Sequence, residues 1–407
     1  MPSPSQKLLF AAIVCAFAPM AAQAAQATRD GPAAQSPLTW EWNARLRHEM
    51  VDDDAFARDA QATTLRLRVG ARLELGGGWN AFVEGEGVAA ADDHYNSGAN
   101  GQAGYPVIAD PVGVELNQAW LGWRNDRAAA TLGRQRVLVG NQRWVGNVGW
   151  RQNEQTFDAL GLEWQPTTKL ATRYLWLDRV HRINGDDARD PLARERSLAS
   201  HLLDLSWGDA AHQWGGFVLA HEDHDVTTAS TLTVGARWSG QRTQGGNVWG
   251  WRIDAARQRE HGSNPLRFSH DYWLLEPSLT RSGVTWRAGW EHLGGDGRHA
   301  LQTPLATLHA FNGWADKFLV TPPGGLDDRY LAAGGALGTD VAAQLKWQLA
   351  WHDYRADTGG DHGREWDASL AFPVHGKLTG LVKLADYRSA GFARDTSKVW
   401  VQLEWVR

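Results

Sequence analysis

The sequence predicts an all-β protein: a transmembrane antiparallel up-and-down β-barrel of 18 strands, with 16 as the alternative count. Three observations predict it. From Trp40 onward, apolar and polar residues alternate in segments about ten residues long. The links between these segments are by turns long and very short, as in barrels that cross a membrane. The N-terminus carries the features of a secretory signal.

The segment 65–75 shows the strand pattern most clearly. Leucine, valine and alanine occupy one phase, and arginine and glutamate occupy most of the other. Because successive side chains of a strand point to opposite faces, one face suits hydrocarbon and the other suits water. The same division recurs in 40–47, 284–291 and 341–351. A soluble sheet with one wet face would also alternate, so the lengths of the links decide between the two.

Each expected strand is a short alternating segment, bounded mostly by residues that favour turns. In chain order the strands are predicted at 40–49, 63–75, 79–90, 114–123, 128–137, 155–164, 170–179, 198–207, 213–221, 230–239, 247–258, 271–280, 284–292, 329–337, 340–351, 365–372, 377–387 and 398–406.

The links alternate in length along this series. If both termini lie in the periplasm, every second link should be a tight hairpin, and Gly-rich and Asn-Asp turns suit such hairpins. The short links are 76–78, 125–126, 165–168, 281–283 and 338–339. The remaining links, such as 91–113, 180–197, 259–270 and 293–328, are longer and polar, which predicts extracellular loops. No repeat of the kind that builds a β-propeller is present.

The N-terminal residues predict export from the cytoplasm. Lys7, the apolar stretch 8–18 and small-residue cleavage sites form a signal peptide over 1–24, with Ala27 as the alternative last residue. Residues 25–38 are expected to be a disordered periplasmic segment, and 39–407 the barrel. The single cysteine lies inside the signal, so no disulfide is expected. The expected location is the outer membrane of a Gram-negative bacterium.

Composition narrows the function further. No segment after the signal is long and apolar enough for a membrane helix, and the 23 tryptophans suit interfacial girdles and lipid-facing positions. A net charge of −5 gives no reason to expect a nucleic-acid partner. Outer-membrane lipid and the barrel-assembly machinery are the expected partners. Neither a cofactor nor a metal is expected, because the histidines lack metal-ligand spacing and the acidic pairs are read as solvated charge.

Many arginines fall in the polar phase of the strands, together with carboxylates. Because a barrel of this width leaves an aqueous lumen, they are candidate pore-lining residues. In one interpretation they form a structural ladder of ion pairs, and in the other an unpaired minority selects anions. The candidates from strand phase are Arg45, Arg47, Arg66, Arg68, Arg72, Glu84, Glu86, Arg237, Arg252, Asp254, Arg287 and Glu291.

Two stretches carry a family resemblance. One runs from Gly133 to Asp158, and the other from Thr303 to Phe318 with Thr321-Pro322-Pro323 after it. Both are similar to the alginate-export family of outer-membrane porins. The resemblance implies an 18-stranded barrel whose Arg-rich lumen passes an anionic polysaccharide in the family's namesake. It also implies a place in the narrow part of the lumen for Arg134, Arg136, Arg143, Arg151 and Asp158. The phase of 128–137 is ambiguous, so Arg134 and Arg136 could point to either face.

The link 293–328 is too long for an ordinary hairpin loop and carries several large apolar residues. We expect it to fold into the lumen and narrow it, with an external cap as the alternative. Its candidate pore residues are His309, Asn312, Trp314, Asp316 and Lys317.

These observations predict a porin, not an enzyme, that passes anionic or polar solutes such as acidic oligosaccharides by diffusion or export. Export of a polysaccharide is the narrower version. Two alternatives stay open: an outer-membrane barrel hydrolase with a serine and a histidine on the wall, and a secreted Trp-rich carbohydrate-binding protein, which would be water-soluble.

Overall fold

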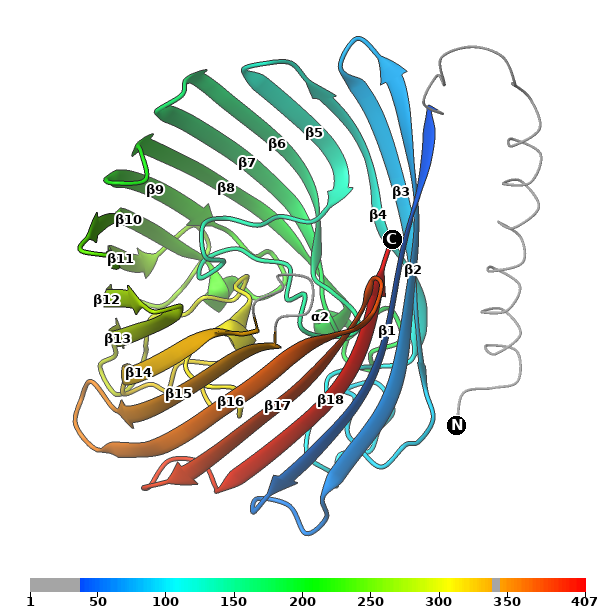
Figure 1. The fold of residues 1–407 in the computed structure, drawn as a ribbon. Coiled ribbons are helices and arrows are strands. Elements are labelled where there is room, and N and C mark those ends of the chain that lie inside the picture. The colour runs from blue at the N-terminus through cyan, green and yellow to red at the C-terminus, as the bar shows by residue number, and fades with distance from the viewer. Residues whose placement is uncertain (1–36, 339–344) are drawn as a thin grey trace.

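The computed structural model describes residues 37–338 and 345–407, and it is a closed antiparallel barrel of 18 strands (Figure 1). Each strand pairs with its neighbours in the chain, and β18 pairs with β1 to close the wall. The strands are β1 (Leu38–Asp53), β2 (Ala60–Gly76), β3 (Trp79–Ala90), β4 (Gly113–Arg124), β5 (Ala128–Gln135), β6 (Thr156–Thr167), β7 (Leu170–His181), β8 (Glu195–Gly208), β9 (Gln213–His221), β10 (Thr231–Gln244), β11 (Asn247–Glu260), β12 (Ser269–Arg281), β13 (Val284–Leu293), β14 (Leu326–Leu337), β15 (Leu345–Arg355), β16 (Asp361–His375), β17 (Leu378–Ser389) and β18 (Thr396–Val406).

The predicted architecture and strand count are therefore confirmed. The secreted, water-soluble alternative is wrong, because the wall is closed and its outer face is apolar. In β2, Leu65 is 42% exposed on that face, whereas Arg66 is buried inside. A closed wall pairs the backbone groups of every strand, which hydrocarbon demands.

The links alternate in length as predicted. Tight turns such as 245–246 and 282–283 close one end of the barrel, and Ser282 and Gly283 both have positive φ, as a two-residue hairpin of the I′ type requires. Links at the other end are mostly longer, and one contains the short helix α2 (Pro191–Arg194). The predicted turn at 338–339 and the first residues of the predicted strand 340–351 fall partly outside the described residues, as do the signal peptide and most of 25–38.

Tryptophans form a belt on the outer face at the end with tight turns. The indoles that are about half exposed and lie close to a tight turn belong to Trp79, Trp164, Trp207, Trp214, Trp249 and Trp286. Aromatic side chains favour the boundary between hydrocarbon and water. Across 37–338 and 345–407, no helix has the length and apolar character needed to span a membrane.

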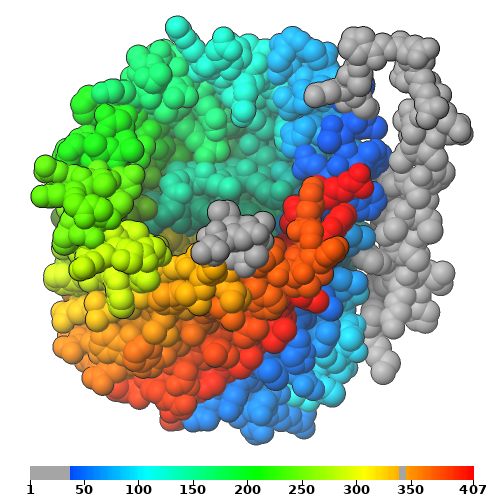
Figure 2. Space-filling view, in the orientation of Figure 1, coloured from blue at the N-terminus to red at the C-terminus, as the bar shows by residue number. Residues whose placement is uncertain are grey.

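Two long links, 136–155 and 294–325, turn into the barrel and cross its interior (Figure 1). The second contains a 3-10 turn, η2 (Leu308–Ala310), and the remaining short helix, η1 (Thr227–Ala229), lies in a different link. Viewed from the end with tight turns, the molecule is hollowed, and residues coloured as the first link form its floor (Figure 2). The main apolar core also lies inside the barrel, where Val145 and Leu305 of the two links are packed among wall residues.

Candidate functional site: the lumen and its two inward links

The link 136–155 is held to the wall by strand arginines. The guanidinium of Arg45 donates to the carbonyls of Gly149 (3.2 Å), Trp150 (3.2 Å) and Arg151 (3.3 Å). Arg47 donates to the carbonyl of Trp150 at 2.7 Å. An irregular segment away from water leaves carbonyls that need donors, and the several N–H groups of arginine supply them. These arginines therefore fix the link across the lumen.

The link 294–325 is held by carboxylates of β1, β13, β14 and β16. The amide of Asn312 donates to Glu291 (2.8 Å) and Asp328 (3.1 Å). The backbone N–H of Ala315 donates to Glu365 at 2.6 Å, and that of Trp314 to Asp367 at 3.3 Å. Lys317 of the same link donates to Asp53 at 2.7 Å. The link thus lies inside the barrel, as expected, and not over it as an external cap.

The two links also bind each other. Gly146 donates from its backbone to the carbonyl of Leu305 at 2.9 Å, and Thr307 donates to the carbonyl of Gln142 at 3.1 Å. The side chain of Arg143 donates to Asn312 at 3.0 Å. Links 136–155 and 294–325 therefore form one body, which we call the constriction.

Asp316 lies at the centre of the constriction. Its carboxylate accepts hydrogen bonds from Arg151 (2.9 Å), Lys398 of β18 (2.9 Å) and Nδ1 of His309 (2.7 Å). Burial alone would raise the pKa of Asp316, but the interactions with His309, Lys398 and Arg151 outweigh burial and hold that pKa well below its usual range. Burial lowers the pKa of His309 to about 3, so its ring is neutral at physiological pH.

The structure shows where the predicted arginines lie. Except for Arg287, each forms an ion pair, which fits the ladder interpretation. Arg45 and Arg66 share Glu404, Arg47 pairs with Asp110, Arg68 with Glu86 and Glu154, Arg72 with Glu41, Arg136 with Glu84 and Glu154, Arg143 with Glu291, Arg151 with Glu49 and Asp316, Arg237 with Asp204, and Arg252 with Asp254.

Arg134 and Asp158 are corrections to the predicted pore lining. The neighbouring strand residue Gln135 is buried inside the barrel opposite Phe157. Because Arg134 and Asp158 alternate with these residues, they point to the outer face, where they pair at 3.0 Å. Asp158 also contacts His181 at 3.0 Å. Arg136, just beyond the strand, points inward.

Arg287 differs from the other candidates. Its side chain is exposed, and within 37–338 and 345–407 it forms no ion pair and no hydrogen bond. It faces a cavity of about 260 Å³ beside the constriction. Its lining also includes Arg252 and His352, together with four carboxylates: Glu276, Glu291, Asp328 and Asp367.

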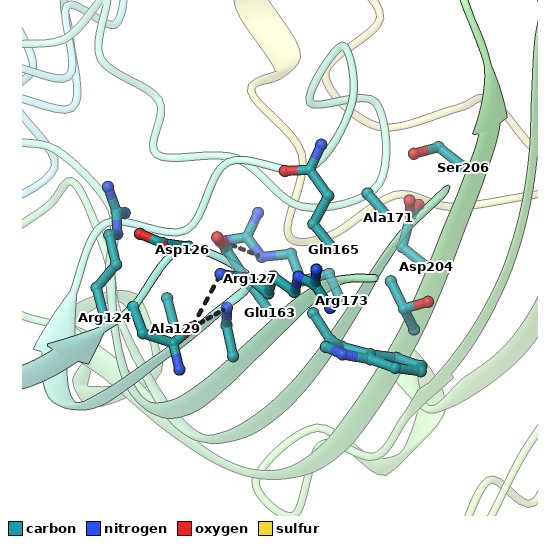
Figure 3. Close-up of a pocket in the computed structure, with 14 residues that line it drawn as sticks. Arg124, Asp126, Arg127, Ala129, Glu163, Gln165, Ala171, Arg173, Asp204 and Ser206 are labelled. Carbon is teal, nitrogen blue, oxygen red and sulfur yellow. Dashed lines mark hydrogen bonds and ion pairs between the residues drawn. The ribbon is translucent and has the colours of Figure 1, made fainter. Parts of the chain in front are cut away.

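A second cavity, of about 420 Å³, lies at the end with tight turns (Figure 3). Arg173 lies beside Glu163 at 3.4 Å in its wall. Arg124 and Arg127 also line it, and neither has an ion pair among the described residues. Strand phase could not predict Arg124 and Arg127, because they sit at a strand end and in a turn, where alternation gives no phase.

Within residues 37–338 and 345–407, one serine–histidine hydrogen bond bears on the hydrolase alternative. Ser200 Oγ lies 2.9 Å from Nδ1 of His221, and both side chains are buried. The other ring nitrogen of His221 is buried and has no hydrogen-bond partner within the described ranges. A catalytic triad needs an acidic group at that nitrogen and an accessible nucleophile. This pair offers neither.

A closed wall with an apolar exterior, a charged interior and an inward constriction defines the protein as an outer-membrane channel. Residues 36–259 match the alginate export family, and the chain belongs to that family of outer-membrane porins. Its members are channels rather than enzymes in general. No curated protein matches the chain by sequence.

Solved structures share the fold. OccAB4 of Acinetobacter baumannii is 12% identical, with 93% of this chain and 100% of that chain covered and a TM-score of 0.68. OpdO of Pseudomonas aeruginosa is 14% identical, with 91% and 97% covered and a TM-score of 0.71. OpdK of Pseudomonas aeruginosa, solved with vanillate, is 14% identical, with 90% and 98% covered and a TM-score of 0.68.

Proposed function

We propose that this porin passes anionic or polar solutes such as acidic oligosaccharides through its lumen by diffusion, without chemistry on the cargo. The observation that carries the proposal is the exposed guanidinium of Arg287, which faces the cavity beside the constriction without a carboxylate partner in the described chain. An anion that enters this cavity can take the place of the missing partner.

The paired arginines have a different role in this proposal. An arginine that shares its charge with an adjacent carboxylate adds little net potential to the lumen, so the ladder stiffens the wall and holds the constriction. An unpaired charge inside a narrow, low-dielectric passage concentrates the local field and attracts ions of opposite sign. Arg287, with Arg124 and Arg127 nearer the tight turns, therefore supplies the selectivity.

The size of the cargo follows from the constriction. Its many hydrogen bonds to the wall favour small carboxylates and short oligosaccharides over a continuous polymer. OpdK, which shares the fold, was solved with vanillate, and a carboxylate of that size agrees with this range. Polysaccharide export, which the family name suggests, would require the constriction to move. We also propose the barrel-assembly machinery as the partner that inserts the chain.

The test compares two charge-neutralising variants in planar bilayers. Arg287→Gln is expected to weaken block of the current by galacturonate and its short oligomers, while block by neutral sugars stays the same. Arg257→Gln is the matched control, because Arg257 is an exposed arginine on a nearby strand that points outward. Equal galacturonate block in wild type and Arg287→Gln would refute the role of Arg287.

A further inference from the structure

Three side chains meet on the outer face of the barrel, at the end with long links. His292 is the penultimate residue of β13, Asp327 is the second residue of β14, and Asp357 lies in the link between β15 and β16. His292 and Asp327 are direct cross-strand partners. One ligand atom from each of the three side chains lies within 4.8 Å of the others. Their distance in the sequence explains why no spacing motif revealed them.

The imidazole of His292 is held in one orientation. Its Nδ1 lies 3.0 Å from Oδ1 of Asp327, and that oxygen also accepts the indole N–H of Trp290 at 2.8 Å. The ring of Trp273 stacks on the imidazole with 3.6 Å between centroids and 7° between planes. With Nδ1–H donated to Asp327, the lone pair of the neutral ring lies on Nε2.

This Nε2 lacks a hydrogen-bond partner in the described structure, although the His292 side chain is only 6% exposed. It lies 3.9 Å from Oδ2 of Asp357, which is too far for a hydrogen bond. Asp357 is itself oriented by the backbone N–H of Gly295 at 3.1 Å. Two electron-pair donors therefore face each other across a short gap, and a cation between them would satisfy both.

We propose that His292 and Asp357 bind a divalent transition-metal ion such as Zn²⁺. Zinc takes imidazole nitrogen and carboxylate oxygen at about 2.0–2.2 Å, so a small closing movement brings both ligands onto one ion. Asp327 is the positioning residue: a carboxylate on the far nitrogen fixes the tautomer and makes the ring a better ligand. Water completes the coordination. The ion ties the link 356–360 to β13 at the outer rim.

The experiment measures Zn²⁺ binding to the folded barrel in detergent micelles, purified without a histidine tag and stripped with a chelator. Equilibrium dialysis should give one saturable site per chain for wild type. His292→Ala and Asp357→Asn should abolish it, and Asp327→Asn should weaken it roughly 10–100-fold. His299→Ala is the matched control, because His299 lies in the link that follows β13 and outside the cluster.

Folding is followed separately by the mobility of each variant on a gel before and after boiling. Folded His292→Ala that loses the site, while His299→Ala keeps it, supports the proposal. Wild type without saturable binding above the level of folded His292→Ala would overturn it. Retention of full binding by folded Asp357→Asn would overturn the assignment of Asp357 as a ligand. Because channel currents are not the readout, failure here leaves the proposed function standing.

Discussion

The ammonium of Lys383 lies 2.7 Å from Nε2 of His309, deep inside the barrel. Lys383 belongs to β17 and His309 to the link 294–325, so this contact joins the wall to the constriction. The ammonium also lies 3.7 Å from the ring centroid of Trp314 and 4.1 Å from that of Trp150. One cation thus contacts both inward links, and a buried cation over aromatic faces stabilises such an arrangement.

Replacing this cation should loosen the constriction. Lys383→Met keeps the length and removes the charge, so the hydrogen bond to His309 and the cation–π contacts are lost. We expect larger single-channel conductance with more frequent current fluctuations. Lys169→Met, which removes an exposed lysine near a tight turn, is the control and should leave the conductance unchanged. Identical current traces for Lys383→Met and wild type would show that Lys383 does not hold the links.

Removing the carboxylate of Asp316 should destabilise the constriction more than removing the charge of Lys383. Asp316→Asn removes the buried partner of Lys398 and leaves Arg151 with Glu49 alone. Breaking one side of a buried ion pair typically destabilises by about 3–5 kcal/mol. Because the wall keeps its own strand pairing, we expect the constriction to open while the barrel stays closed. Conductance should rise, and limited proteolysis should cut within 294–325 in the variant only. Protection equal to that of wild type would contradict this account.

The constriction should also respond to acid. A released His309 would titrate near 6.5, whereas burial lowers its pKa to about 3 in the constriction. The packed state therefore binds fewer protons between these values, so its stability falls as the pH drops below 6.5. The pKa of Asp316 is also lowered, so protonation of Asp316 at still lower pH reduces the stability of the packed constriction further.

The measurement is conductance against pH. From pH 8 to 5 we expect no change in conductance from the titration of His309. Toward pH 3 we expect the conductance to increase as the constriction opens. His309→Gln retains hydrogen-bonding capacity without the histidine titration and should shift this increase to lower pH. A step centred near pH 6.5 that disappears in His309→Gln would show that His309 titrates freely.

A variant of Arg134 tests whether this side chain lies on the outer face, away from the ion path. Because Arg134 points to the outer face and pairs with Asp158, neutralising it should not change ion selectivity. Arg134→Gln should have the same reversal potential as wild type, whereas Arg287→Gln should shift it toward zero. A shift in Arg134→Gln as large as that in Arg287→Gln would place Arg134 in the ion path after all.

The barrel could be predicted because strand alternation and tight turns each depend on residues that are close together in the sequence. Alternation follows from the pleat, and tight turns need glycine or asparagine, as in Gly245-Gly246. The partners of the lumen residues could not be predicted in the same way. Arg45 meets Glu404 only because the last strand closes on the first.

The face to which some candidate residues point could not be predicted where a strand is irregular. β5 ends at Gln135, and Gly133 has a φ of 122°, so alternation could not be followed through Arg136. Lys383 was missed for another reason. Its phase in β17 also carries Leu381 and Ala385 and so does not read as a polar face, and the rings around Lys383 come from both inward links and β18.

The sign of the reversal potential tests the central claim most directly. Wild-type protein is reconstituted in a planar bilayer under a potassium chloride gradient. Its reversal potential should have the sign expected for a chloride-selective channel, because the unpaired arginines attract anions. A potential of the sign that potassium permeation sets would contradict the account, since the lumen would then select cations despite Arg287.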